Sequence, residues 1–347
     1  MLNYMIFVDN EIEELWDAVQ KAQIVIHPIF APEGRFNIGE FRKRIDEKPF
    51  MMVIDRNIFS ALIRLCRQGE LEDKHEMQMI GILMAWADLN RVSVTVGPAL
   101  MEYATNGKTQ DDALRELKMF QEIMEQVPSQ IWLEVARGIE KITPCNFSGG
   151  LADKITVDYA GGCEHYYLSY ASMVHLAILY RSRSTRCEKM EKFLEWSYDN
   201  VIISNYVIVY SILLFSNQSH VSAPKNVMSK SIDKILAGCR NQAWDLSYIS
   251  NLGYLYFHEK DYKEDFLFAT NDNMLKMVYI NGIDIEGIGN LIYSAFNKKE
   301  AERICLYINE RQKCRVKPIH EDEIQYYKQL VENETKVLER IINEDKC

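Results

Sequence analysis

Acidic residues follow apolar segments at two points in the first third of this chain. Asp55 comes directly after the apolar run of residues 50–54, and an apolar pattern at helical spacing follows it. Glu102 lies about one helical turn beyond residues 91–96, a β-branched and alternating segment that predicts a strand. The carboxylate of an acid in such a position can cap the following helix or bind a cation.

Two further acids occupy similar positions later in the chain. Asp272 lies in the polar corner after residues 266–269, another expected strand, and Asp245 opens the helix expected before that strand. Ligands of parallel α/β sheets bind outside the carboxyl ends of the strands. We therefore expect the four carboxylates to face one edge of one sheet.

Four neighbouring carboxylates repel one another unless a cation neutralises them. Hard oxygen ligands of this kind suit Mg²⁺ or Mn²⁺, which are usually held by few carboxylates together with water and substrate phosphate. Such a site supports in-line attack of water on a phosphodiester, with one ion or with two ions ~4 Å apart.

Each acid also has a purely structural interpretation. Taken alone, Asp55 fits a helix cap, Asp272 a turn or cap residue, and Asp245 a first-turn acid favoured by the helix dipole. Glu102 fits a solvated helix residue. The metal-site hypothesis depends on the four acids acting together.

The pattern of apolar residues predicts an α/β protein with a helical middle. Strand patterns alternate with helices at both ends of the chain, which favours a parallel sheet. Residues 201–215 form the longest apolar stretch, which we expect to be a buried helix because it is shorter than the roughly 20 residues that span a bilayer. A terminal amphipathic helix is expected from about residue 321.

We expect five parts along the chain. In order, these are an N-terminal segment packed on the core, the first part of the core, a helical insertion, the second part of the core and a helical C-terminal extension, at residues 1–48, 49–109, 110–235, 236–285 and 286–347.

Charge and cysteine content narrow the class of protein. The 50 acidic and 40 basic residues give a formal net charge of −10, which argues against a protein that coats nucleic acid non-specifically. It allows an enzyme that takes a polyanion into a local site, where metal ions supply the positive charge. The eight cysteines form no CxxC pair, and the N-terminus lacks a basic segment before an apolar stretch. We therefore expect a cytoplasmic protein with reduced thiols, no signal peptide and no membrane segment.

Four stretches resemble, in order, the motifs of the PIN-like nuclease family. They read MVIDRNIFSAL, VSVTVGPALMEY, AWDLSYISNL and FLFATNDNML. The resemblance implies a PIN-like parallel sheet interrupted by a large helical insertion between the second and third acidic motifs. It also implies a catalytic, metal-binding set at Asp55, Glu102, Asp245 and Asp272, with Asn57 and Thr270 as supporting polar contacts.

The same resemblance implies metal-dependent phosphodiester hydrolysis by an endoribonuclease that acts as a toxin or defence effector. The residues themselves do not distinguish RNA from DNA. A helical insertion over the site would suit control by an inhibitory or regulatory protein partner, and a homo-oligomer is left open. The alternative is a non-catalytic PIN-fold interaction protein that binds a partner through its helical insertion.

The densest basic run of the predicted insertion is RSRSTRCEK, at residues 181–189. Such a run is usually a solvated surface, but Arg181, Arg183 and Arg186 could instead contact an RNA backbone.

Overall fold

The computed structural model describes residues 9–31, 35, 37–153, 156–216, 221–283, 285–314 and 320–344. The chain divides into two compact units. The first comprises residues 1–162 and 254–272, and the second comprises residues 163–253 and 273–347. A β-sheet with flanking helices forms in the first unit, and the second is helical, so the predicted mixed α/β class is confirmed.

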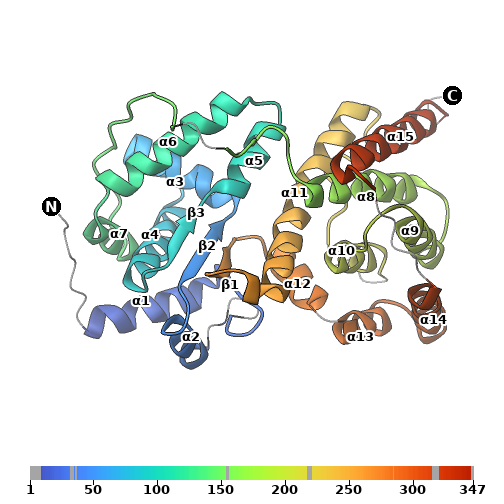
Figure 1. The fold of residues 1–347 in the computed structure, drawn as a ribbon, viewed down its shortest axis with the longest axis horizontal. Coiled ribbons are helices and arrows are strands. Elements are labelled where there is room, and N and C mark those ends of the chain that lie inside the picture. The colour runs from blue at the N-terminus through green and yellow to red at the C-terminus, as the bar shows by residue number, and fades with distance from the viewer. Residues whose placement is uncertain are drawn as a thin grey trace. The chain divides into compact units, whose positions relative to one another are not determined.

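The sheet of the first unit has four strands in the order β1-β4-β2-β3 (Figure 1). Their bounds are β1 Val25–Ile26, β2 Phe50–Ile54, β3 Ser93–Thr95 and β4 Asp265–Ala269. β2 pairs in parallel with both β3 and β4, whereas β1 pairs antiparallel with β4. The three strands predicted from the sequence are confirmed, and β3 is shorter than residues 91–96.

Strand β2 lies inside the sheet, between β3 and β4, because its residues are apolar on both faces. Four of its five residues are buried, as expected for a parallel strand covered on both sides. β3 and β4 lie on opposite sides of β2, so the chain reverses its winding direction there. In open α/β sheets this reversal point, at the carboxyl edge, is where ligands bind.

The helices of the first unit follow the predicted apolar patterns. Their bounds are α1 Asp9–Ala22, α2 Ile38–Ile45, α3 Arg56–Gln68, α4 Lys74–Leu89, α5 Gly97–Thr105, α6 Gln110–Gln126 and α7 Ser129–Ala136, with a 3₁₀ turn η2 at Glu259–Asp261. Helix α4 is buried along most of its length and packs against α1, α3 and α7. Trp86 of α4 lies edge-on to Trp16 at 5.6 Å, in a continuous apolar core.

The second unit is built from helices. Their bounds are α8 Glu164–Arg181, α9 Arg186–Asn200, α10 Asn205–Phe215, α11 Ile232–Phe257, α12 Asn273–Gly282, α13 Ile285–Ala295, α14 Lys298–Cys314 and α15 Glu323–Glu344, and the last turn of α11 belongs to the first unit. α10 confirms the predicted buried helix, and no described helix is long and apolar enough to cross a bilayer. Helices α6 and α7, within the predicted insertion of residues 110–235, cluster with the sheet.

Gly81 permits the close contact between α4 and α7. A Cβ atom at this position would lie 2.5 Å from the backbone nitrogen of Ala136 and 2.7 Å from Cγ1 of Val135. We expect Gly81→Ala to lower the free energy of unfolding by about 1–3 kcal/mol, because neither helix can move without disturbing the core. Urea unfolding measures the effect.

Gly39→Ala is the matched control in the same unit. Its Cβ would meet only Oδ1 of Asn37 at an ordinary 3.5 Å, so we expect a change within about 0.5 kcal/mol. Equal losses in the two variants would contradict the packing argument.

Candidate metal site

Asp55 is the residue that joins β2 to α3. Its N–H donates to the carbonyl of Ala269 over 3.1 Å, which extends the pairing with β4 by one residue. Its Oδ1 accepts from the N–H of Ile58 at 2.7 Å, so the side chain caps α3. The capping interpretation of Asp55 is therefore confirmed.

Capping uses only one oxygen of this carboxylate. Asp55 is 3% exposed, and its Oδ2 has no hydrogen-bond partner among the described residues. A buried polar atom left without a partner costs about 1–3 kcal/mol, more if charged, and most such atoms in native structures have a partner or a function. The cap therefore does not account for the second oxygen.

The neighbouring strand supplies a second carboxylate. Ile54 and Ala269 are paired in register, so the residues that follow β2 and β4 leave the sheet side by side. Thr270 is fully buried, and its Oγ1 accepts from the N–H of Asp272 over 3.0 Å. Asp272 is half-buried and close enough for its charge to act on Asp55.

The electrostatics of Asp55 follow from this arrangement. Burial raises the pKa of its carboxyl, and the negative charge of Asp272 adds to the increase. Hydrogen bonding from the N–H groups of Ile58 and Asn57 and from the hydroxyl of Thr270 lowers it, but the net shift of the pKa is upward. Thr270 does not reach Oδ2 in good hydrogen-bond geometry. A cation bound beside the carboxyl would favour its charged form and so oppose the upward shift.

Glu102 lies where the sequence predicted it, on the short helix after β3. Pro98 stands in the first turn of this helix, α5, where its missing N–H has no cost. α5 packs against β2 and α3, and Glu102 is half-buried.

Asp245 does not open a helix, so that expectation is wrong. α11 begins at Ile232 and has 26 residues, which places Asp245 near its middle. Asp245 belongs to the second unit, where Nε2 of Gln242 lies 3.4 Å from its Oδ2. Burial raises the pKa of Tyr210, and the negative charge of Asp245 contributes to the increase.

The structure therefore brings Asp55 and Asp272 together, with Thr270 beside them and the exposed Asn57 on the first turn of α3. Within the described ranges, no three side chains of His, Cys, Asp or Glu form a group that could hold a metal ion. The shared site of four acids stays a prediction.

Two of the three arginines proposed for RNA contact have structural partners. Arg181 donates to the carbonyls of Val227 at 2.9 Å and Ser229 at 3.1 Å, and Arg186 donates to the carbonyl of Ser216 at 2.7 Å. Arg183 is exposed. RNA contact by this run also stays a prediction.

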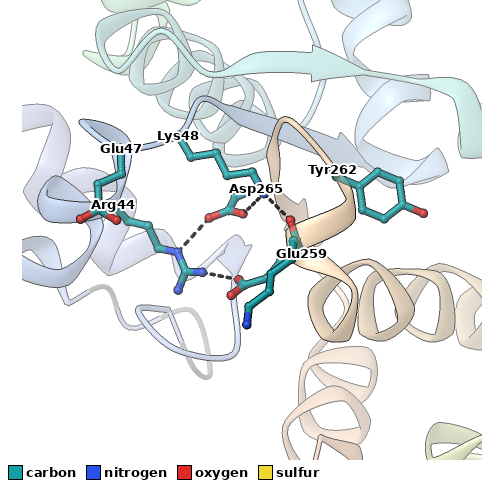
Figure 2. A pocket seen from close by; sticks show the side chains of 7 residues that line it. Arg44, Glu47, Lys48, Glu259, Tyr262 and Asp265 are labelled. Atoms are coloured by element: carbon teal, nitrogen blue, oxygen red, sulfur yellow. Dashed lines mark hydrogen bonds and ion pairs between the residues drawn. The ribbon is translucent and has the colours of Figure 1, made fainter.

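The sequence analysis missed a charged cluster at the opposite edge of the sheet. Asp265, 3% exposed at the start of β4, accepts from Nε of Arg44 at 2.8 Å and pairs with Nζ of Lys48 at 2.9 Å. Figure 2 shows these side chains, with Glu259 bound to Arg44, lining a pocket of about 380 Å³. The three consecutive basic residues at 42–44 were the feature of the sequence that could have pointed to this cluster. Because two cationic side chains balance the negative charge of Asp265, we infer that the cluster stabilises the fold.

Comparison with protein-family profiles, with curated proteins and with solved structures finds no match to this chain. The site must therefore be interpreted from its own geometry.

Asp55→Asn keeps the capping oxygen and removes the charge. The folded protein binds the Asp55 proton more tightly than the unfolded chain, whose carboxyl titrates near the ordinary value of 3.8. Wild type should therefore lose stability relative to the variant as pH rises from about 4 through the raised pKa, with a constant difference above it. Urea unfolding without divalent ions, over this pH range, tests the expectation.

Asp88→Asn provides the control, because Asp88 is an exposed acid on α4. A difference between wild type and Asp55→Asn that does not change with pH would show that the Asp55 carboxyl is not perturbed.

Proposed function

We propose that this protein is a metal-dependent nuclease whose site includes Asp55 and Asp272 at the carboxyl edge of the sheet. One observation carries the proposal, namely the buried Oδ2 of Asp55. Among the described residues this atom has no hydrogen-bond partner, and the negative charge of Asp272 acts on the same carboxyl. Capping accounts for one oxygen of Asp55 and leaves the other to bind a ligand.

The donor set fits Mg²⁺ or Mn²⁺. Both ions prefer oxygen ligands, and a magnesium ion is commonly held by one or two carboxylates plus water and substrate phosphate. Asp55 and Asp272 would hold the ion, and the PIN-like resemblance adds Glu102 of the same unit to the proposed set.

When bound, the ion would supply activation of water and stabilisation of negative charge on a phosphodiester. The chain's own residues supply position. The cap to Ile58 and the backbone bond to Ala269 hold Asp55, and Thr270 holds the backbone of Asp272. These contacts hold the Asp55 carboxylate and the backbone of Asp272 at the sheet edge.

Arg56, the arginine nearest to Asp55 in the sequence, is paired with other side chains. Arg56 forms a two-point ion pair with Glu116, and its guanidinium lies 4.2 Å from the ring centre of Tyr103. Because Arg56 is balanced in this way, phosphate binding beside Asp55 would depend chiefly on the divalent ion.

The finer parts of the proposal rest on the resemblance to PIN-like nucleases. They are an RNA substrate, a toxin or defence role, and control by a regulatory protein partner. The chemistry of the two carboxylates applies equally to the phosphodiesters of RNA and DNA.

Cleavage of single-stranded RNA and DNA with Mn²⁺ tests the proposal. We expect Asp55→Asn and Asp272→Asn to lower the cleavage rate by at least about 100-fold, because each removes a charged ligand. Asp88→Asn should cleave like wild type.

Thermal unfolding gives a second readout that does not depend on substrate. Mn²⁺ should raise the melting temperature of wild type and of Asp88→Asn, with a much smaller effect on Asp55→Asn. Equal cleavage by wild type and both site variants would show that the activity comes from another site or from a contaminant. Absence of both cleavage and Mn²⁺ stabilisation would favour the interaction protein.

A further inference from the structure

An extended segment, residues 142–152, crosses helices α3 and α6 of the first unit. We call it the strap. At α3, the N–H of Ile142 donates to the carbonyl of Gly69 at 2.8 Å, and the N–H of Cys145 donates to the carbonyl of Cys66 at 2.7 Å. The last carbonyls of a helix have no partner within it, so the strap satisfies two groups at the end of α3.

Helix α6 fixes the position of the strap along its length. The side-chain amide of Gln126 accepts from the N–H of Asn146 at 2.9 Å and donates to its carbonyl at 3.0 Å. Farther along, the carboxylate of Glu122 accepts from the N–H of Ser148 at 3.3 Å. These contacts hold the strap in one register, and Cys145 lies within the part of the strap that they hold.

Cys66 and Cys145 therefore face each other across a backbone hydrogen bond. With N and O 2.7 Å apart, standard bond lengths and angles limit the two Cα atoms to a separation below about 6.5 Å. Disulfides span Cα distances of about 4.4–6.8 Å. The two thiols are also close enough for each to affect the pKa of the other. Cys66 is buried and Cys145 half-buried.

We propose that Cys66 and Cys145 form a reversible disulfide when the protein meets a peroxide, which fastens the strap covalently to α3. This inference does not depend on the nuclease proposal. The unoxidised state matches the reduced thiols expected from the sequence, and both cysteines are free in the structure.

The chemistry balances with hydrogen peroxide as the oxidant. The Cys145 thiol first loses its proton, and the thiolate attacks one peroxide oxygen. The O–O bond breaks, a sulfenic acid forms, and the leaving hydroxide takes up the proton from the thiol to give water. The Cys66 sulfur then attacks the Cys145 sulfur, the S–O bond breaks, and the leaving hydroxide takes up a proton to form a second water. Two thiols are oxidised, and one peroxide is reduced to two waters.

The surroundings of the two thiols favour Cys145 as the one that attacks the peroxide. Burial raises the pKa of both thiols, and the negative charge of Glu122 also raises that of Cys145. The hydrogen bond from Cys66 lowers the pKa of Cys145 and raises that of Cys66. Cys145 is also the more exposed of the two, so peroxide should meet it first and Cys66 should then resolve the sulfenic acid.

Peptide mapping of the full chain after hydrogen peroxide treatment, under non-reducing conditions, tests the proposal. We expect one dominant cross-linked peptide pair that joins Cys66 to Cys145, two hydrogen atoms lighter than the two peptides combined and absent after reduction with dithiothreitol. The melting temperature should rise on oxidation and return on reduction.

Cys66→Ser and Cys145→Ser should each abolish the cross-link and the shift. Cys187→Ser should keep both, because the Cys187 sulfur contacts Arg303 in the second unit. Far-ultraviolet circular dichroism checks that the variants fold. Oxidation of Cys145 to sulfinic acid without the cross-link, or the same temperature shift in Cys145→Ser, would overturn the proposal.

Discussion

The parallel pairing of β2 with β4 is the constraint on which the candidate site depends. The two strands run in register from Phe50 beside Asp265 to Ile54 beside Ala269. One hydrogen bond beyond each end continues the pairing, from Asp265 to Pro49 and from Asp55 to Ala269. These bonds hold the same register at both ends of the strand pair. That register places Asp55 beside Thr270 and Asp272.

The two ends of this strand pair differ in the charged partners of their buried aspartate. At the amino edge, the buried Asp265 is balanced by Arg44 and Lys48. At the carboxyl edge, the buried Asp55 has a carboxylate, not a cation, as its charged neighbour. A buried charge is stable when it is paired, so the first arrangement serves the fold, whereas the second is expected where function requires a cation or a proton.

The strap contains no helix or strand, yet specific hydrogen bonds hold it in one position. Its N–H groups bond to the carbonyls of the buried Cys66 and Gly69 at the end of α3 and to side chains of α6. Buried backbone groups are nearly always paired in this way. The sequence TPCNFSGG, residues 143–150, is rich in Pro, Gly, Ser and Asn, a composition typical of loops. The local signal was correct about the absence of helix and strand, but the contacts of Gln126 and Glu122 with the strap come from residues about 20 positions away or more.

The sequence by itself determined the elements that depend on local pattern. The strand–Asp–helix unit at Asp55 and the buried helix α10 follow from apolar spacing, capping chemistry and length. Tertiary structure decided everything that depends on long-range pairing. It placed Asp245 in the middle of α11, put α6 beside the sheet and committed Arg181 to backbone carbonyls. Above all, it left one oxygen of Asp55 without a hydrogen-bond partner in the described part of the chain, because hydrogen bonding of a side chain depends on which distant residues surround it after folding.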